Sequence, residues 1–193
     1  MVRAATPADI PAILDIYAPY VLNSTATFEY TVPTMEEFRQ RFDTIAAQYP
    51  WLVWEEEGEI LGYAYASPPY SRAAYAWCAE PSIYLRDDAK GRGIGTKLYD
   101  ALEAILLWQG YHVLYALITE ENTGSVAFHA DRGYEKRAFF PECGLKFSRW
   151  LGVFWMEKRL KTVEIPTNFP VSWLSIGQKG EKRVDILDSL SLS

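Results

Sequence analysis

The fold of this chain is decided by two adjoining stretches, Ser82-Ile83-Tyr84-Leu85 and Lys90-Gly91-Arg92-Gly93-Ile94-Gly95-Thr96. The first reads as a strand. The second precedes an amphipathic helix whose apolar residues recur at helical spacing: Leu98, Ala101, Leu102, Ile105 and Leu106. Glycines let successive backbone N–H groups point into one concavity, and the helix N-terminus adds partial positive charge. Lys90 and Arg92 add full charges, so the loop is predicted to bind a pyrophosphate.

Two other phosphate-binding motifs do not fit this loop. A Walker loop requires Gly-Lys followed by Ser or Thr, whereas Gly95 is followed by Thr96-Lys97. A Rossmann fingerprint requires a third glycine where Thr96 stands, early in a βαβ unit. An ordinary glycine-rich turn without a ligand is the remaining alternative to a phosphate site.

Segments on both sides of the loop predict a mixed α/β domain. Helix-start signals at residues 6–9 and 34–37 open helices that run to about Val21 and Gln48. A short helix is predicted at residues 125–132, and strands at residues 2–5, 51–56, 60–66, 75–85, 111–118, 134–140 and 153–159. This order indicates a sheet with helices on both faces, ending at residue 160. Residues 161–193 read as an extension that packs on the domain or stays partly loose.

Composition limits the class of protein. Hydrophobic residues make up 49% of the 193 residues and aromatic residues 15%, enough for a substantial core. The formal net charge of −6 argues against nucleic acid or an anionic membrane as the main partner. The most apolar stretch, residues 101–118, is interrupted by polar residues, and the start lacks a signal-peptide pattern. Two cysteines, Cys78 and Cys143, are too few for a disulfide framework or a four-ligand zinc site, so we expect a cytoplasmic protein without a metal.

The phosphate loop and a second block resemble the GNAT superfamily of N-acetyltransferases. The loop follows the superfamily pattern, although Lys90 replaces the usual Gln or Arg. The second block is Asn122-x-x-Ser125-Val126-x-Phe128-His129-x-x-x-Gly133-Tyr134. Within the superfamily, the chain is most similar to phosphinothricin and methionine sulfoximine acetyltransferases, through Tyr63-Ala64-Tyr65-Ala66, Ala79-Glu80-x-Ser82-Ile83-Tyr84-Leu85 and Lys146-Phe147-x-Arg149-Trp150-Leu151.

The resemblance spans residues 2–160 and implies a mostly antiparallel sheet, acetyl-coenzyme A as cosubstrate and a homodimer. It implies cofactor contacts from Ile83, Tyr84, Leu85, Lys90, Gly91, Arg92, Gly93, Ile94, Gly95, Thr96 and Asn122. In such proteins the pantetheine arm pairs with exposed strand amides. Pro81 suits this arrangement because proline cannot donate to a sheet ladder, although an ordinary edge would also tolerate it. Asn122 would either bind the pantetheine arm or cap the following helix.

Acetyl transfer to an amine requires a base for the ammonium proton, a polarised thioester carbonyl and a stabilised leaving thiolate. Glu80 is the candidate base, because burial next to Trp77 and Cys78 would raise its pKa; a solvent-facing glutamate is the alternative. The resemblance places His129 near the thiolate, where it would donate or accept a proton; a structural histidine is the alternative. Direct attack by the amine leaves covalent catalysis by Cys78 as a minor alternative.

The predicted substrate is a small amino-acid-like amine whose carboxylate binds a guanidinium. The most similar acetyltransferases place an Arg in the loop before Glu80, where Tyr70 stands here, and Arg72 is a candidate to replace it. Other candidate pocket residues are Tyr75 and Lys146, together with Phe28 and Trp150. The alternative functions are acetylation of a peptide or protein amine, and binding of acetyl-coenzyme A without catalysis.

Overall fold

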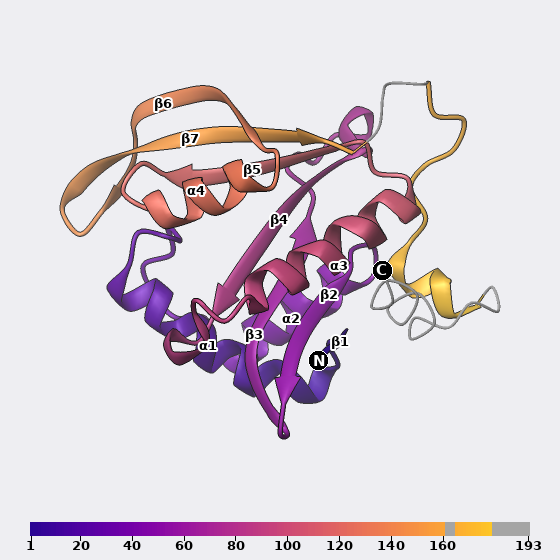
Figure 1. Ribbon diagram of the computed structural model, residues 1–193, viewed down its shortest axis with the longest axis horizontal. Coiled ribbons are helices and arrows are strands. Elements are labelled where there is room, and N and C mark those ends of the chain that lie inside the picture. Colours follow the sequence, from indigo (N-terminus) through magenta and orange to yellow (C-terminus); the bar gives the residue numbers. More distant parts are fainter. Residues whose placement is uncertain (161–164, 179–193) are drawn as a thin grey trace.

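The computed structural model describes residues 1–160 and 165–178, and Figure 1 shows a twisted sheet with helices on both faces. Across the sheet, in the order β1-β2-β3-β4-β5-β7-β6, the strands are β1 Val2–Ala4, β2 Trp51–Glu56, β3 Glu59–Ser67, β4 Cys78–Leu85, β5 Val113–Thr119, β7 Arg149–Arg159 and β6 Glu135–Lys146. The α-helices are α1 Ile10–Asn23, α2 Met35–Ala46, α3 Ile94–Gln109 and α4 Thr123–Asp131. Neighbouring strands are antiparallel except β4 and β5, which are parallel, so the predicted fold class is confirmed.

Local sequence signals set most element boundaries. At the start of α2, the Thr34 side chain accepts from the Glu37 N–H, and the Glu37 carboxylate accepts from the Thr34 N–H. Helix α3 ends at Gly110, whose φ of +98° lies in the left-handed region that favours glycine. The predicted strand from residue 75 was wrong at its start, since a 3₁₀ turn delays β4 to Cys78. Strands β6 and β7 are longer than predicted, because they continue to a tight turn at residues 147–148.

Apolar side chains form two cores, one on each face of the sheet. Helices α1 and α2 cover one face, where Trp51 and Tyr63 are buried against Phe38 and other helix side chains. Helix α3 covers the opposite face through fully buried residues such as Leu98 and Leu102. Strand β4 lies between these layers, so its alternate side chains face opposite sides of the sheet.

Strands β4 and β5 separate after a very short stretch of pairing. They pair at Cys78–Val113 and Ala79–Leu114. Pro81 follows in β4, where its missing N–H cannot extend the ladder toward β5. The expected opening beside Pro81 is therefore present, and a narrow slot runs between the two strands.

Residues 165–178 of the expected C-terminal extension pack against the domain. Trp173 and Ile176 are 2% and 1% exposed and belong to the same core as α3. The backbone N–H of Trp173 donates to the backbone carbonyl of Gln48 at 3.0 Å. The Phe169 ring stacks on Trp77, the residue before β4. Packing on the domain therefore holds for this segment, and the core does not stop at the predicted boundary of residue 160. Residues 161–164 and 179–193 of the expected extension lie outside the described part.

Candidate active site

Strand β4 presents different residues to the two sides of the sheet. Ile83 and Leu85 pack toward the core of α3. Glu80, Ser82 and Tyr84 face the side of α1 and α2, where they line a cavity of about 320 Å³. A volume near 300 Å³ suits a small-molecule ligand. We call this cavity the acceptor cavity.

Two cavities meet at Glu80. The acceptor cavity is closed by β3, the loop of residues 25–29 and α2. The second cavity, the slot between β4 and β5, holds about 70 Å³ and reaches Asn122, Ser125 and His129 of the α4 region. Both cavities share Ala26, Glu80, Ser82, Tyr84, Leu117 and Thr119. A group in the slot would therefore meet a group in the acceptor cavity beside the Glu80 carboxylate.

The Glu80 carboxylate is more basic than an exposed glutamate. Burial raises the pKa of its carboxyl group above the ordinary value, and no opposite charge among the described residues offsets this effect. A carboxylate with a raised pKa is a stronger base, closer to the range that general-base catalysis at neutral pH requires. The predicted partial burial of Glu80 is thus present.

His129 is held as a neutral imidazole. It is 3% exposed, and burial lowers its pKa to about 4. Its Nδ1 lies 2.8 Å from Ser125 O, which can only accept, so Nδ1 carries the hydrogen. The Nε2 atom then accepts from the Tyr99 hydroxyl at 2.8 Å; Pro81 O lies farther from that hydroxyl, at 3.3 Å. At neutral pH His129 therefore accepts this hydrogen bond and carries no hydrogen on Nε2.

The glycine loop has the geometry expected of a phosphate site. Gly91 and Gly93 have φ values of +74° and +76°, and Gly93 is the N-cap of α3. The N–H groups of a first helical turn have no partner within the helix, so they are available to a phosphate. Around both glycines a Cβ would meet nothing within 4 Å, which leaves room for a ligand.

The two cations of the loop are engaged with acidic side chains. Lys90 Nζ lies 2.6 Å from Asp87 Oδ1, and Arg92 Nη2 lies 2.6 Å from Glu56 Oε1. Both pairs are largely exposed, so each costs little to open. Lys90 and Arg92 can therefore turn to an anionic cofactor without leaving a buried charge unpaired.

The remaining predicted cofactor residues surround the loop and the slot. A Cβ on Gly95 would lie in ordinary van der Waals contact with Ile83 and Leu85, at 3.4 and 3.5 Å, so α3 begins beside β4. Ile94 is buried beside it, and Thr96 follows in the first turn of α3. Asn122 lines the slot, and its Oδ1 accepts from the Ser125 N–H at 3.2 Å. The capping role predicted for Asn122 is present, and its amide NH₂ group can still donate.

The predicted substrate residues do not line the acceptor cavity. Arg72 is exposed, and the Tyr75 ring packs against the Tyr70 ring at a tilt of 37°, with ring centroids 4.4 Å apart. Lys146 is 1% exposed, and its ammonium donates to Ser24 O at 2.8 Å and Thr27 O at 2.7 Å. Lys146 thus holds the loop that closes the cavity instead of facing a substrate, because its donors are directed to those carbonyls. Phe28 does line the cavity, whereas Trp150 does not.

Sequence reasoning missed several polar residues of the site, among them Arg41, Tyr65 and Tyr99. Arg41 and Tyr65 line the acceptor cavity, and Tyr99 lines the slot. A signal for Arg41 was present, because it falls at helical spacing from Phe38 and Phe42, on the apolar stripe of α2. A cation on an apolar stripe needs an anionic partner, so the sequence could have predicted that Arg41 lies beside a carboxylate.

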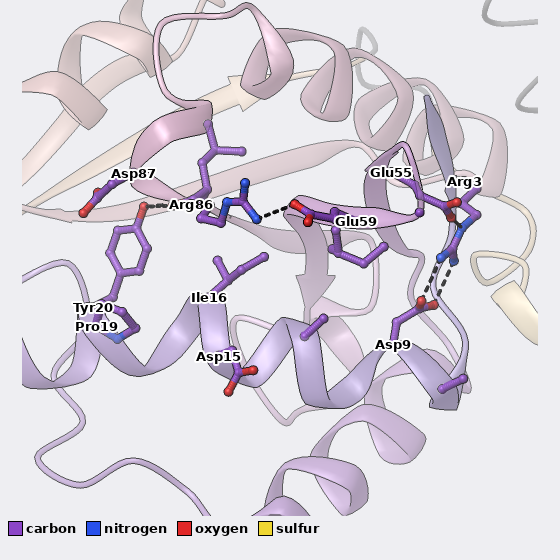
Figure 2. A pocket seen from close by; sticks show the side chains of 15 residues that line it. Arg3, Asp9, Asp15, Ile16, Pro19, Tyr20, Glu55, Glu59, Arg86 and Asp87 are labelled. Carbon is purple, nitrogen blue, oxygen red and sulfur yellow. Dashed lines mark hydrogen bonds and ion pairs between the residues drawn. The ribbon is translucent and has the colours of Figure 1, made fainter.

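A larger cavity of about 710 Å³ lies elsewhere, between α1 and the β2–β3 hairpin (Figure 2). Figure 2 shows its two guanidinium groups directed at carboxylates: Arg3 pairs with Asp9 and Glu55, and Arg86 pairs with Glu59. The cavity includes neither Glu80 nor His129. Although this cavity is larger than the acceptor cavity, it lacks the candidate catalytic residues and is not the candidate reaction site.

A sheet that opens between β4 and β5, with a phosphate loop at the start of α3, defines the class of protein. Residues 2–155 match the model of the acetyltransferase (GNAT) domain, and the chain belongs to this family of acetyltransferases. Among the described residues, no helix combines the length and apolar character that crossing a bilayer requires.

Individual relatives are similar over most of their length. An L-methionine sulfoximine/L-methionine sulfone acetyltransferase of Pseudomonas aeruginosa is 38% identical over 161 residues, 82% of this chain and 94% of the relative. A phosphinothricin N-acetyltransferase of Streptomyces viridochromogenes is 36% identical over 155 residues, 80% and 85% of the two chains. The crystal structure of a phosphinothricin acetyltransferase from Sinorhizobium meliloti in complex with acetyl-coenzyme A has a TM-score of 0.81 and 36% identity, and the match covers 89% of this chain and 98% of that one.

Proposed function

We propose that this protein transfers the acetyl group of acetyl-coenzyme A to the amine of a small amino-acid-like substrate. The observation that carries the proposal is the position of Glu80, at the junction of the acceptor cavity with the slot. The glycine loop has room and N–H donors for the pyrophosphate, and Ile83 and Tyr84, which precede the loop in β4, line the slot together with Glu80. The named activities of the relatives, on methionine sulfoximine, methionine sulfone and phosphinothricin, support an amino-acid-like acceptor.

The proposed reaction proceeds by direct attack. Glu80 accepts a proton from the substrate ammonium, directly or through one water, which leaves a free amine beside the thioester. The amine nitrogen attacks the carbonyl carbon, and the resulting tetrahedral intermediate carries its surplus proton on nitrogen. The carbon–sulfur bond then breaks, and the surplus proton on nitrogen passes to the leaving thiolate, which gives the N-acetylated product and the free thiol of coenzyme A. Glu80 releases its proton to solvent before the next turnover. Coenzyme A supplies the activated acyl group, so this step requires no acyl-enzyme.

We assign His129 to the slot side of this reaction. Its neutral Nε2 accepts from Tyr99, which orients the phenolic oxygen next to the carbonyl of Pro81. Both atoms lie where β4 opens toward β5. His129 then acts as a positioning residue for Tyr99 and supplies no proton of its own at neutral pH, since its pKa is about 4.

A homodimer and a cytoplasmic location form part of the proposal. The β6–β7 hairpin carries large exposed side chains that a second subunit would cover: Phe139, Phe140, Leu145, Phe147 and Trp150. Light scattering of the purified protein tests the dimer, because a monomeric mass at micromolar concentration would contradict it. Fractionation of cells that express the full chain tests the location.

Thiol release provides the direct test of the activity. Acetyl-coenzyme A is mixed with L-methionine sulfone, L-methionine sulfoximine or phosphinothricin, and free coenzyme A is measured together with the N-acetylated product. We expect product with at least one of these amino acids and none without an acceptor. Binding of acetyl-coenzyme A without turnover of any amine would instead assign the chain as a binding module.

A further inference from the structure

The acceptor cavity contains a guanidinium group that nothing in the transfer chemistry uses. Among the described residues that line the cavity, Arg41 of α2 is the only cation. Lys146 is directed at two carbonyls of the adjoining loop, and Arg72 lies outside the cavity. A cation at this place provides a binding partner for the anionic oxygens of an acceptor.

We propose that Arg41 recognises the acceptor substrate through oxygens that carry a full or partial negative charge, and that Glu29 positions the Arg41 guanidinium. This inference rests on the proposed function, because it assigns a binding role to the cavity of the same reaction. The oxygens have two possible sources in an amino-acid-like acceptor: the α-carboxylate, or the oxygens of a sulfone, sulfoximine or phosphinate side chain. Both sources accept hydrogen bonds from a guanidinium in the same way.

The Arg41 side chain is fixed in the wall of the cavity. Its Nη2 lies 2.6 Å from Glu29 Oε1, and about a third of each side chain is exposed. The guanidinium also lies over the Phe38 ring, 5.5 Å from the centroid. An arginine has five N–H donors in a rigid fork, so a contact with one carboxylate oxygen leaves donors free for a second anion. The pair is therefore arranged in advance, and little side-chain entropy is lost when a substrate binds.

The charges of Arg41 and Glu80 both affect one side chain of the cavity wall, Tyr65. Both charges reach the Tyr65 hydroxyl: burial raises its pKa to about 12, while the Arg41 charge lowers this pKa and the Glu80 charge raises it. Arg41, Tyr65 and Glu80 all line the acceptor cavity. This cavity therefore offers a carboxylate to an ammonium group and a guanidinium to negatively charged or polarised oxygens. An acceptor that carries both charges satisfies both groups, whereas a simple amine satisfies Glu80 alone.

The test compares three acceptors with the wild-type protein and Arg41→Gln. L-methionine sulfone carries both sources of oxygens, its methyl ester lacks the carboxylate charge, and L-methionine lacks the side-chain oxygens. We expect Arg41→Gln to lower kcat/KM for L-methionine sulfone by roughly 10- to 100-fold, the usual effect of hydrogen bonds to a charged group. If the carboxylate is the source, this loss disappears for the methyl ester; if the side-chain oxygens are the source, it disappears for L-methionine.

Two control variants separate recognition from other effects. Arg39→Gln removes an exposed arginine from the same helix, one that pairs with Asp43, and should leave kcat/KM unchanged. Glu29→Gln/Arg41→Gln removes both charges, so a loss that persists in it cannot come from an unpaired Glu29. Wild-type kcat/KM in Arg41→Gln, an equal loss with all three acceptors, or recovery in the double variant would each overturn the proposal. Absence of thiol release by the wild-type protein with any acceptor would instead contradict the proposed function itself.

Discussion

The Tyr99 hydroxyl lies 2.8 Å from Nε2 of the buried His129, and both residues line the slot. With this contact, both nitrogens of the His129 ring have a hydrogen-bond partner. The other ring nitrogen donates to Ser125 O within α4. A protonated imidazole would need an acceptor at Nε2, and the Tyr99 hydroxyl would have to turn its hydrogen elsewhere. The pair therefore links the charge of His129 to the orientation of Tyr99 and to the stability of the fold.

The first prediction concerns this histidine and pH. Its pKa is 6.5 in the unfolded chain and about 4 in the folded one, so the unfolded chain binds a proton that the folded chain does not. Stability is thus retained above pH 6.5 and lost as pH falls toward 4, by about 2 kcal/mol between pH 7.5 and pH 5 for this residue. Urea unfolding at these pH values should show a smaller pH-dependent loss in His129→Gln than in the wild type. Equal slopes would mean that His129 titrates normally.

A second prediction addresses Tyr99 itself. Tyr99→Phe keeps the buried ring but leaves His129 Nε2 without its donor, which should cost about 1–3 kcal/mol of stability. If Tyr99 also orients groups in the slot, kcat should fall while the affinity for acetyl-coenzyme A stays the same. Calorimetric titration with the cofactor and steady-state kinetics separate the two effects. Unchanged kcat with lower stability would restrict the Tyr99–His129 pair to a structural role.

Glu80 provides a third prediction. Because burial raises its pKa, kcat/KM should rise with pH through an apparent pKa of the free enzyme or the free amine. Glu80→Gln keeps the shape and removes the base, so activity at neutral pH should fall by roughly 10²- to 10⁴-fold. Part of the activity should return at high pH, where more of the substrate is a free amine. A Glu80→Gln protein with full activity at every pH would exclude Glu80 as the base.

The glycine loop gives a fourth prediction. Gly93→Asp places a carboxylate where the pyrophosphate would lie and should abolish the rise in melting temperature that acetyl-coenzyme A causes in the wild type. Gly58→Asp is a matched control: Gly58 also has a positive φ, +83°, and open space around its Cα, but it lies in the β2–β3 turn. Both variants carry similar backbone strain, so only the loop variant should lose the shift. The same shift in both variants would place the cofactor elsewhere.

A fifth prediction tests the C-terminal segment. Trp173 is 2% exposed within the core of α3, whereas its neighbour Leu174 is 51% exposed. Trp173→Ala should therefore lower the free energy of unfolding by about 3–5 kcal/mol, and Leu174→Ala should change it by much less. Urea denaturation of the two variants gives the comparison. Equal stability of both variants would show that the domain does not depend on this segment.

Much of the fold could be predicted because its signals are local. The capping box at Thr34 and Glu37, the left-handed Gly110 and the glycines of the loop each fix a boundary through their own chemistry. The position of Trp173 could not be predicted in this way, because its packing depends on contacts with residues more than a hundred positions away, such as Gln48.

The features of the candidate site that the sequence predicts depend on a single strand, whereas a cavity formed by several elements could not be predicted. Glu80 and Pro81 both belong to β4, so alternation and the missing proline N–H were sufficient guides. The acceptor cavity combines α2, β3 and the loop of residues 25–29, and spacing in sequence does not reveal that Arg41 faces Glu29 there. The position of Lys146 outside this cavity could not be predicted, because its two carbonyl partners come from a loop about 120 residues earlier in the chain.

The docking of residues 165–178 also has a consequence for synthesis on the ribosome. Domains generally begin to fold as they emerge, from the N-terminus onward. Here all seven strands leave the exit tunnel before Trp173 does, so the nascent sheet is complete while the site that receives this indole, beside Gln48 and the end of α3, is still uncovered. The interval before that side is covered is when the nascent chain exposes apolar surface to chaperones and proteases.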